Sequence, residues 1–160
     1  MKFYTIQVYK IGYTIHLANC KLWLRIFLWY DRMKNGDIMQ NYENEVRERF
    51  GDTEAYNEHK DKTKNYTDEK WFALADEMNA IFKEFADCKN SGAEVSSSEA
   101  QVLVAKLLNF ISENYYTCTT EILKGLGQMY VVDERFKNNI DQHGNGTTEF
   151  VSKAIEIYCG

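Results

Sequence analysis

A chain of 160 residues, of which 44% are hydrophobic and 27% charged, has the composition of an ordinary globular protein and is long enough for one substantial core. It contains no proline and only nine glycines, which is too few turn-forming residues for a compact all-β protein and favours helices. The net charge of −5 argues against nucleic acid as the main partner, because Lys and Arg dominate the recognition of phosphate backbones.

The first 40 residues differ in composition from the rest of the chain. We treat residues 1–40 as an atypical extension and residues 41–160 as the folded domain. Residues 1–34 contain six Lys or Arg side chains and one Asp, a net charge of +5, which leaves −10 for the remainder of the chain. The acidic domain is therefore not expected to bind nucleic acid by itself.

The extension contains a strongly apolar segment over residues 22–30. His16, Lys21 and Arg25 interrupt every window long enough to cross a membrane, so a spanning helix is not expected. No uninterrupted apolar region is followed by a small-residue cleavage site, which argues against a signal peptide. We therefore expect a cytoplasmic protein with no membrane partner.

From residue 41 the chain becomes periodic, and two short helices are predicted first. The first covers residues 42–50 and is closed by Gly51, a natural residue at a helix C-terminus. Asp52 is then expected to cap a helix that ends near Lys64. Both helices are charged and sparsely apolar, so they bury little surface unaided.

A longer helix is predicted to begin at Thr67. Asp68 and Glu69 fall in its first turn, where acidic side chains complement the helix dipole. The break over residues 90–92 ends it. One face follows the i, i+3, i+4, i+7 spacing of a buried helix stripe. That face consists of Trp71, Leu74, Ala75, Met78, Ile81, Phe82 and Phe85.

The next helix is predicted from a capping box. Ser96 and Glu99 stand three residues apart, directly before an apolar run, which is typical of a helix N-terminus. A broad buried stripe follows from this start. Its members are Leu103, Val104, Leu107, Leu108, Phe110 and Ile111.

Three more helices complete the predicted domain. One starts near Thr117, a shorter one is capped by Asp133, and the last opens at Thr147 after a loop over residues 143–146. The expected core positions are Ile122, Leu123, Leu126 and Met129, then Phe136 and Ile140, then Phe150, Val151, Ala154, Ile155 and Tyr158. The sequence thus predicts an all-α domain of six or seven helices.

Residues 115–141 are the most informative segment for function. Gly125 and Gly127 each cost about 1 kcal/mol relative to alanine within a helix, which indicates either a close helix crossing or room for a ligand. Both alternatives stand at this stage. The aromatic side chains around them line an apolar pocket or fill the core, and their spread over two helices favours a pocket. They are Tyr115, Tyr116, Tyr130 and Phe136.

The sequence gives only thin support for an enzyme. It contains no GxSxG elbow, P-loop, dinucleotide fingerprint or HExxH motif, and acidic pairs such as Glu43 and Glu45 lie on what reads as a solvated face. The four cysteines show no CxxC or His-paired spacing, so free thiols in a reducing cytoplasm are expected, with no metal and no cofactor.

Cys118 is the one residue that suggests a chemical role. Near a helix N-terminus the dipole favours the thiolate, which would support a small thiol-dependent enzyme. No histidine lies near Cys118 in sequence to act as a base, so packing as a small apolar side chain is the favoured interpretation.

Several blocks of the sequence match a known family pattern. They are VRERFGDT at 46–53, YT at 66–67, Trp71, YTC at 116–118, GLGQMY at 125–130 and DERF at 133–136. In this order and spacing, over roughly residues 41–158, the chain resembles the TipAS antibiotic-recognition domain. That domain is the C-terminal effector part of a subgroup of MerR-type transcription regulators.

The resemblance implies a globin-like helical fold with a cleft for bulky, hydrophobic, peptide-derived antibiotics such as thiopeptides. It implies a drug sensor or a sequestering resistance protein, with the N-terminal helices closing over the ligand. Together with the aromatic pattern, it gives a set of candidate ligand-binding residues. They are Trp71, Met78, Tyr115, Tyr116, Cys118, Ile122, Gly125, Met129, Tyr130 and Phe136.

Two departures from the family pattern matter. Some members capture a drug covalently on a cysteine seven residues after the position of Cys118, but Gly125 stands there, so reversible binding is expected. The winged-helix domain and the dimerising coiled coil of the regulators have no counterpart in 40 residues, which favours a monomer. The alternative is a truncated MerR-type regulator in which residues 1–40 contribute to DNA binding or dimerisation.

Overall fold

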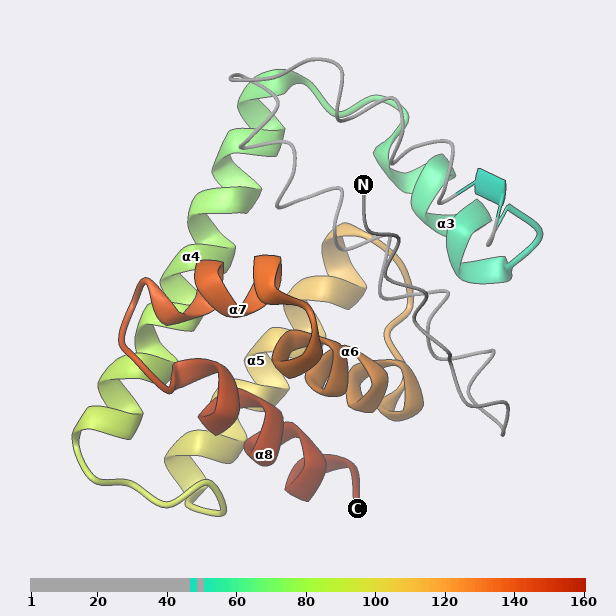
Figure 1. The fold of residues 1–160 in the computed structure, drawn as a ribbon. Coiled ribbons are helices and arrows are strands. Elements are labelled where there is room, and N and C mark those ends of the chain that lie inside the picture. Colours follow the sequence, from blue (N-terminus) through green and yellow to red (C-terminus); the bar gives the residue numbers. More distant parts are fainter. Residues whose placement is uncertain (1–46, 49–50) are drawn as a thin grey trace, which may run out of the picture.

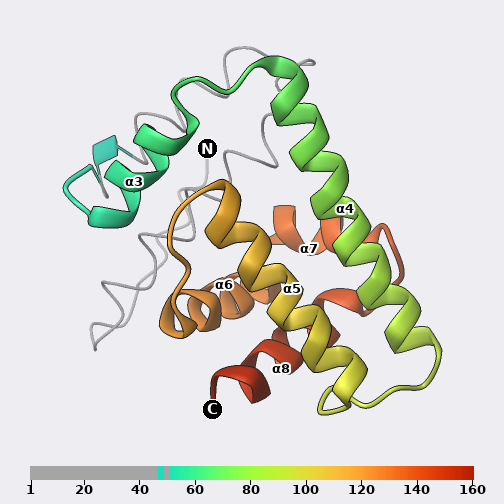
Figure 2. The ribbon, with the colours of Figure 1, turned by 180° about the vertical axis from the view of Figure 1, so that it is seen from behind.

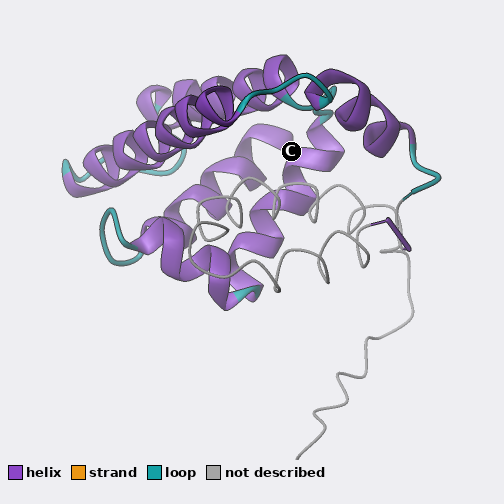
Figure 3. Ribbon diagram, turned by 90° about the horizontal axis from the view of Figure 1, so that it is seen from above, coloured by secondary structure: helices purple, strands orange, loops and turns teal. Residues whose placement is uncertain are grey.

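The computed structural model describes residues 47–48 and 51–160, and this part of the chain consists of helices and their connections, with no strand (Figures 1 and 3). The helices are α3 (Glu54–Thr63), α4 (Asp68–Asn90), α5 (Ser98–Asn114), α6 (Thr120–Val132), α7 (Glu134–Asp141) and α8 (Thr147–Cys159). The predicted all-α class is confirmed. Within the described ranges, no helix combines the length and hydropathy that a membrane crossing requires.

Two sequence predictions fall largely or wholly outside the described residues. The extension over residues 1–40 lies entirely outside them. Of the helix predicted over residues 42–50, only residues 47–48 are described, and they are helical. The backbone N–H of Gly51 donates to the Arg47 carbonyl at 2.9 Å, which is the hydrogen bond of a closing helical turn.

Helix α8 packs against α4, α5, α6 and α7. Helices α4 and α5 pair as a hairpin, and Gly92 in their connection adopts φ 83°, a conformation that favours glycine. The most extensive helix pair is α6 with α8. Helix α3 stands to one side of this bundle, and the views from front and back agree on its position (Figures 1 and 2).

At most of the helix starts, the side chain of the N-cap residue accepts a hydrogen bond from the first turn. The predicted cap is correct for α4 and for α7. The Thr67 side chain accepts from the Lys70 N–H at the start of α4, and Asp133 accepts from the Arg135 N–H at the start of α7. The final helix begins at Thr147, as predicted, after Gly146 at φ 79°.

Three predicted helix starts are wrong by one to three residues. Thr53 caps α3 in place of Asp52, and Ser97 caps α5 in place of Ser96, because in each pair the second side chain accepts the hydrogen bond from the first turn. Helix α6 begins at Thr120 and not near Thr117. The residues N-terminal to Thr119 are held instead by contacts with α3, described below.

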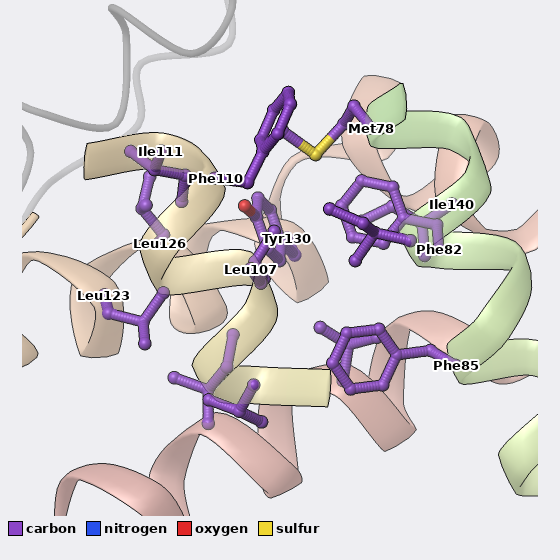
Figure 4. Close-up of a cluster of buried hydrophobic side chains, with 14 of the residues drawn as sticks. Met78, Phe82, Phe85, Leu107, Phe110, Ile111, Leu123, Leu126, Tyr130 and Ile140 are labelled. Carbon is purple, nitrogen blue, oxygen red and sulfur yellow. The ribbon is translucent and has the colours of Figure 1, made fainter. Parts of the chain in front are cut away.

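The core lies between α4, α5, α6, α7 and α8 (Figure 4). The Phe82 ring meets the Tyr130 ring edge-on with centroids 5.9 Å apart, and Tyr130 lies 5.8 Å from Phe136 in a tilted arrangement. The predicted apolar face of α4 is buried from Leu74 to Phe85, while Trp71 is half-buried. One core prediction is wrong: Tyr158 is 38% exposed, because the fully buried face of α8 ends at Ile155.

Gly127 allows α6 to approach α8 closely. A Cβ atom at this position would lie 3.1 Å from Cγ2 of Ile155, which is tighter than ordinary van der Waals contact. A close helix crossing therefore accounts for Gly127. Gly125 is also buried in α6, and its predicted place in a ligand site stays a prediction.

Candidate functional site

Five aromatic side chains gather where α3, the start of α4 and the end of α5 meet. We call this group the aromatic junction: His59, Tyr66, Trp71, Phe110 and Tyr115. The ring centroids of His59, Trp71 and Tyr115 form a triangle, with 6.2 Å from Tyr115 to each of the others and 6.5 Å between His59 and Trp71. Tyr66 meets Trp71 edge-on at 5.3 Å, and Phe110 meets Tyr115 edge-on at 5.8 Å. Such offset and edge-on pairs are the favoured aromatic geometries.

Tyr115 is the central ring of the junction and the residue that ends α5. Its side chain is fully buried, and its hydroxyl has no hydrogen-bond partner among the residues that the structure describes. Burial, with smaller contributions from Tyr66 and Glu77, raises the pKa of Tyr115 far above its ordinary value of 10.0. The junction therefore contains a neutral hydroxyl, not a phenolate, at neutral pH.

Besides the His59 ring, α3 and the residues just after it make polar contacts to the last turn of α5 and to the α5–α6 connection. The Glu58 carboxylate accepts from the Thr117 backbone N–H at 2.8 Å and from the Thr117 hydroxyl at 2.9 Å. Lys62 Nζ donates to the Ser112 carbonyl at 2.7 Å, and the Tyr66 hydroxyl, just after α3, donates to the Asn114 carbonyl at 2.8 Å. The two bonds with Glu58 hold Thr117 in the connection, ahead of Thr119, which caps α6.

The contact between Glu58 and Thr117 should depend on pH. Burial raises the pKa of Glu58, but the hydrogen bonds from Thr117 and the charge of Lys62 outweigh it, so the net shift is below the ordinary value of 4.5. A folded-state pKa below the unfolded one stabilises the fold above about pH 4.5, and this stabilisation is lost as the pH falls through the folded value.

We expect Glu58→Gln to lower the free energy of unfolding at pH 7 by about 1 kcal/mol, since hydrogen bonds to a charged group are weakened at a partly exposed site. The difference from the unaltered protein should shrink as the pH falls below about 4.5 and Glu58 becomes protonated. Urea unfolding across this pH range measures both effects. Asp61→Asn is the control on the same helix, because Asp61 is 80% exposed and should change little. Parallel pH profiles for Glu58→Gln and the unaltered protein would contradict the prediction.

The predicted site residues fall into three places in the structure. Trp71 and Tyr115 belong to the aromatic junction. Met78, Tyr130 and Phe136 are buried in the core, in the same cluster as Phe110 of the junction (Figure 4). The others lie on the α5–α6 connection or on α6. Tyr116, Cys118 and Gly125 are buried there, whereas Ile122 and Met129 are half-buried against the core.

Cys118 lies directly before the residue that caps α6. Its side chain is 5% exposed, its backbone N–H donates to the Ser112 hydroxyl at 3.1 Å, and its thiol contacts the Thr119 carbonyl at 3.8 Å. This burial supports the packing interpretation over a reactive thiol. In the described part of the chain, no three His, Cys, Asp or Glu side chains are grouped as metal ligands would be.

Sequence reasoning missed three members of the junction as site residues: His59, Tyr66 and Phe110. His59 is 1% exposed although its helix is highly charged. A signal was available, because Tyr56, His59 and Thr63 repeat at the i, i+3, i+7 spacing and form the inward face of α3. The partner across the junction, Tyr115, was predicted, but nothing in the sequence pairs it with a residue 56 positions earlier.

Comparison with known proteins places this geometry in a family. Residues 42–158 match the family model of the TipAS antibiotic-recognition domain. The chain is 39% identical over 114 residues to the HTH-type transcriptional activator TipA of Streptomyces coelicolor, covering 71% of this chain and 45% of the relative. It is 34% identical over 120 residues to the HTH-type transcriptional activator mta of Bacillus subtilis, covering 75% and 46%. The chain thus spans about half the length of these relatives.

A solved structure is similar as well. TipAS of Streptomyces lividans in complex with nosiheptide, part of a thiopeptide antibiotic multidrug resistance system, superposes with a TM-score of 0.68 at 37% identity. The match covers 75% of this chain and 84% of that one.

Proposed function

Because the chain belongs to the TipAS antibiotic-recognition domain family, we propose that it binds bulky, hydrophobic, peptide-derived antibiotics of the thiopeptide class, with the aromatic junction as part of the binding site. The observation that carries this proposal is the meeting of rings from α3, α4 and α5 around Tyr115. Large flat side chains of this kind supply apolar contact area at low cost in conformational entropy.

The attachment of α3 supports a role for this helix in ligand binding. A few partly exposed hydrogen bonds join it to the end of α5 and to the α5–α6 connection. Among the described helices, it does not share the extensive packing that holds α4, α5, α6, α7 and α8 together. A bulky apolar ligand at the junction would contact rings from α3 and from the bundle together. Ligand binding would then supply free energy for holding α3 in place.

Binding is proposed to be reversible, with Gly125 at the position where some family members carry a reactive cysteine. The other candidate ligand residues are those predicted from the sequence. Two of them, Trp71 and Tyr115, stand in the junction. The core residues Met78, Tyr130 and Phe136 belong to the same buried cluster as Phe110, whose ring contacts Tyr115. We propose that the protein acts in the cytoplasm as a monomer, and that the binding domain begins near residue 41.

Melting of the full chain with and without nosiheptide tests the proposal. A ligand at 100 times its Kd stabilises the folded state by about 2.7 kcal/mol, which corresponds to a rise in Tm of about 5–10 °C for a domain of this size. We expect a rise of this order that grows with nosiheptide concentration. A compound of similar size and hydropathy without peptide groups is the control. No shift with nosiheptide or related thiopeptides at saturating concentration would refute the proposed function.

A second role follows from the relatives, which are transcriptional activators about twice as long as the matched region. In this alternative the chain is a transcription regulator that responds to the drug. Residues 1–40, with their net positive charge, then contribute to DNA binding or dimerisation. A mobility shift on promoter DNA that persists at physiological salt would favour the sensor. Binding that disappears at that salt concentration reflects only non-specific attraction.

A further inference from the structure

We propose that the Tyr115 hydroxyl is a specificity-determining donor in the junction, which hydrogen-bonds to a carbonyl oxygen or ring nitrogen of the bound antibiotic. This inference rests on the proposed function, since it assigns one recognition step within the same site. The ligand class that it selects is a flat, largely apolar, peptide-derived molecule that presents an uncharged acceptor between aromatic rings.

The first support is that the hydroxyl is buried and has no partner among the described residues. A buried hydroxyl proton without an acceptor loses its hydrogen bond to water and gains none in the protein. Natural structures satisfy the large majority of such groups, so each exception needs a reason. A ligand acceptor that arrives from outside provides one.

The second support is that other buried or half-buried hydroxyl groups of this protein donate hydrogen bonds within the fold. The Thr63 hydroxyl, which is also buried, donates to the His59 carbonyl at 2.8 Å. The buried Thr148 hydroxyl donates to Asp141 Oδ1 at 2.8 Å. Within the junction itself, the Tyr66 hydroxyl donates to the Asn114 carbonyl at 2.8 Å. Unlike these three hydroxyls, that of Tyr115 has no acceptor among the described residues.

The third support is that the ring is fixed in place. The His59 and Trp71 rings stack against Tyr115 at interplanar angles of 15° and 20°, and Phe110 meets it edge-on. A ring packed in this way cannot swing its hydroxyl to a distant acceptor without breaking these contacts. The ligand must therefore bring its acceptor to the hydroxyl. Because a charge buried among these rings would be costly, the acceptor should be uncharged.

The test compares Tyr115→Phe with the unaltered full chain by calorimetric titration with nosiheptide and by thermal melting without drug. We expect nosiheptide affinity to fall about tenfold, which is the loss of one ligand hydrogen bond. The drug-free Tm should not fall, because phenylalanine keeps the ring and removes only an oxygen that has no partner in the described part of the chain. Tyr66→Phe is the matched control and should lower the drug-free Tm, since it removes the donor to Asn114.

Two results would overturn this assignment while leaving the proposed function intact. One is nosiheptide affinity for Tyr115→Phe equal to that of the unaltered protein. The other is a drug-free Tm that falls as it does for Tyr66→Phe, which would mean that the hydroxyl is already bonded within the protein. If the unaltered protein neither binds nosiheptide in the titration nor gains Tm with it, the proposed function and this assignment fail together.

Discussion

Replacing Phe82 by alanine should lower the free energy of unfolding by about 4 kcal/mol, within the range found for large aromatic side chains removed from a core. Phe82 is 0% exposed and meets Tyr130 edge-on, and Tyr130 in turn contacts Phe136. The ring therefore joins α4 to α6, and through it to α7. Its loss removes the contacts and leaves a cavity that the surrounding helices fill only in part.

Urea unfolding followed by circular dichroism measures this loss. Val132→Ala is the control: its side chain lies on α6 and is 82% exposed, so we expect a change within about 0.5 kcal/mol. A loss below about 2 kcal/mol for Phe82→Ala would show that the helices collapse into the space, and that the core is less rigidly packed than the structure indicates.

The regular features of this fold could be predicted because they depend on local periodicity. The buried face of α4 follows the helix repeat from Leu74 to Phe85, and the helix begins after Thr67 as its capping pattern indicates. The errors at Asp52 and Ser96 arose where two capping residues are adjacent, since sequence alone does not decide which side chain accepts the hydrogen bond.

The candidate site could be predicted only in part, because it is assembled from distant segments. Tyr115 and Trp71 were predicted as ligand residues, and the structure brings their rings to 6.2 Å. The contact of Glu58 with Thr117 joins residues 59 positions apart, and no local pattern indicates such a pair. His59 was overlooked because it lies within a charged helix, where burial depends on what packs against that helix.

Trp71→Ala should weaken nosiheptide binding at least about 100-fold, an effect typical of a central tryptophan in a binding site and equivalent to about 2.8 kcal/mol. Trp71 contacts three members of the junction: His59, Tyr66 and Tyr115. Its removal opens the triangle of rings and withdraws one flat wall from the proposed ligand. Because Trp71 is only half-buried, we expect a smaller loss of drug-free stability than for Phe82→Ala.

Trp71→Phe separates the loss of a ring from the loss of folding. A phenylalanine keeps a flat apolar wall against Tyr115, so its nosiheptide affinity should fall by no more than about tenfold, between the unaltered protein and Trp71→Ala. Titration at a temperature well below each variant's Tm ensures that folded protein is compared. If Trp71→Ala is fully folded there and binds nosiheptide as tightly as the unaltered protein, the ligand does not lie at the junction. The α6 residues Ile122, Gly125 and Met129, which were predicted in the same set but do not belong to the junction, would then be the remaining candidates.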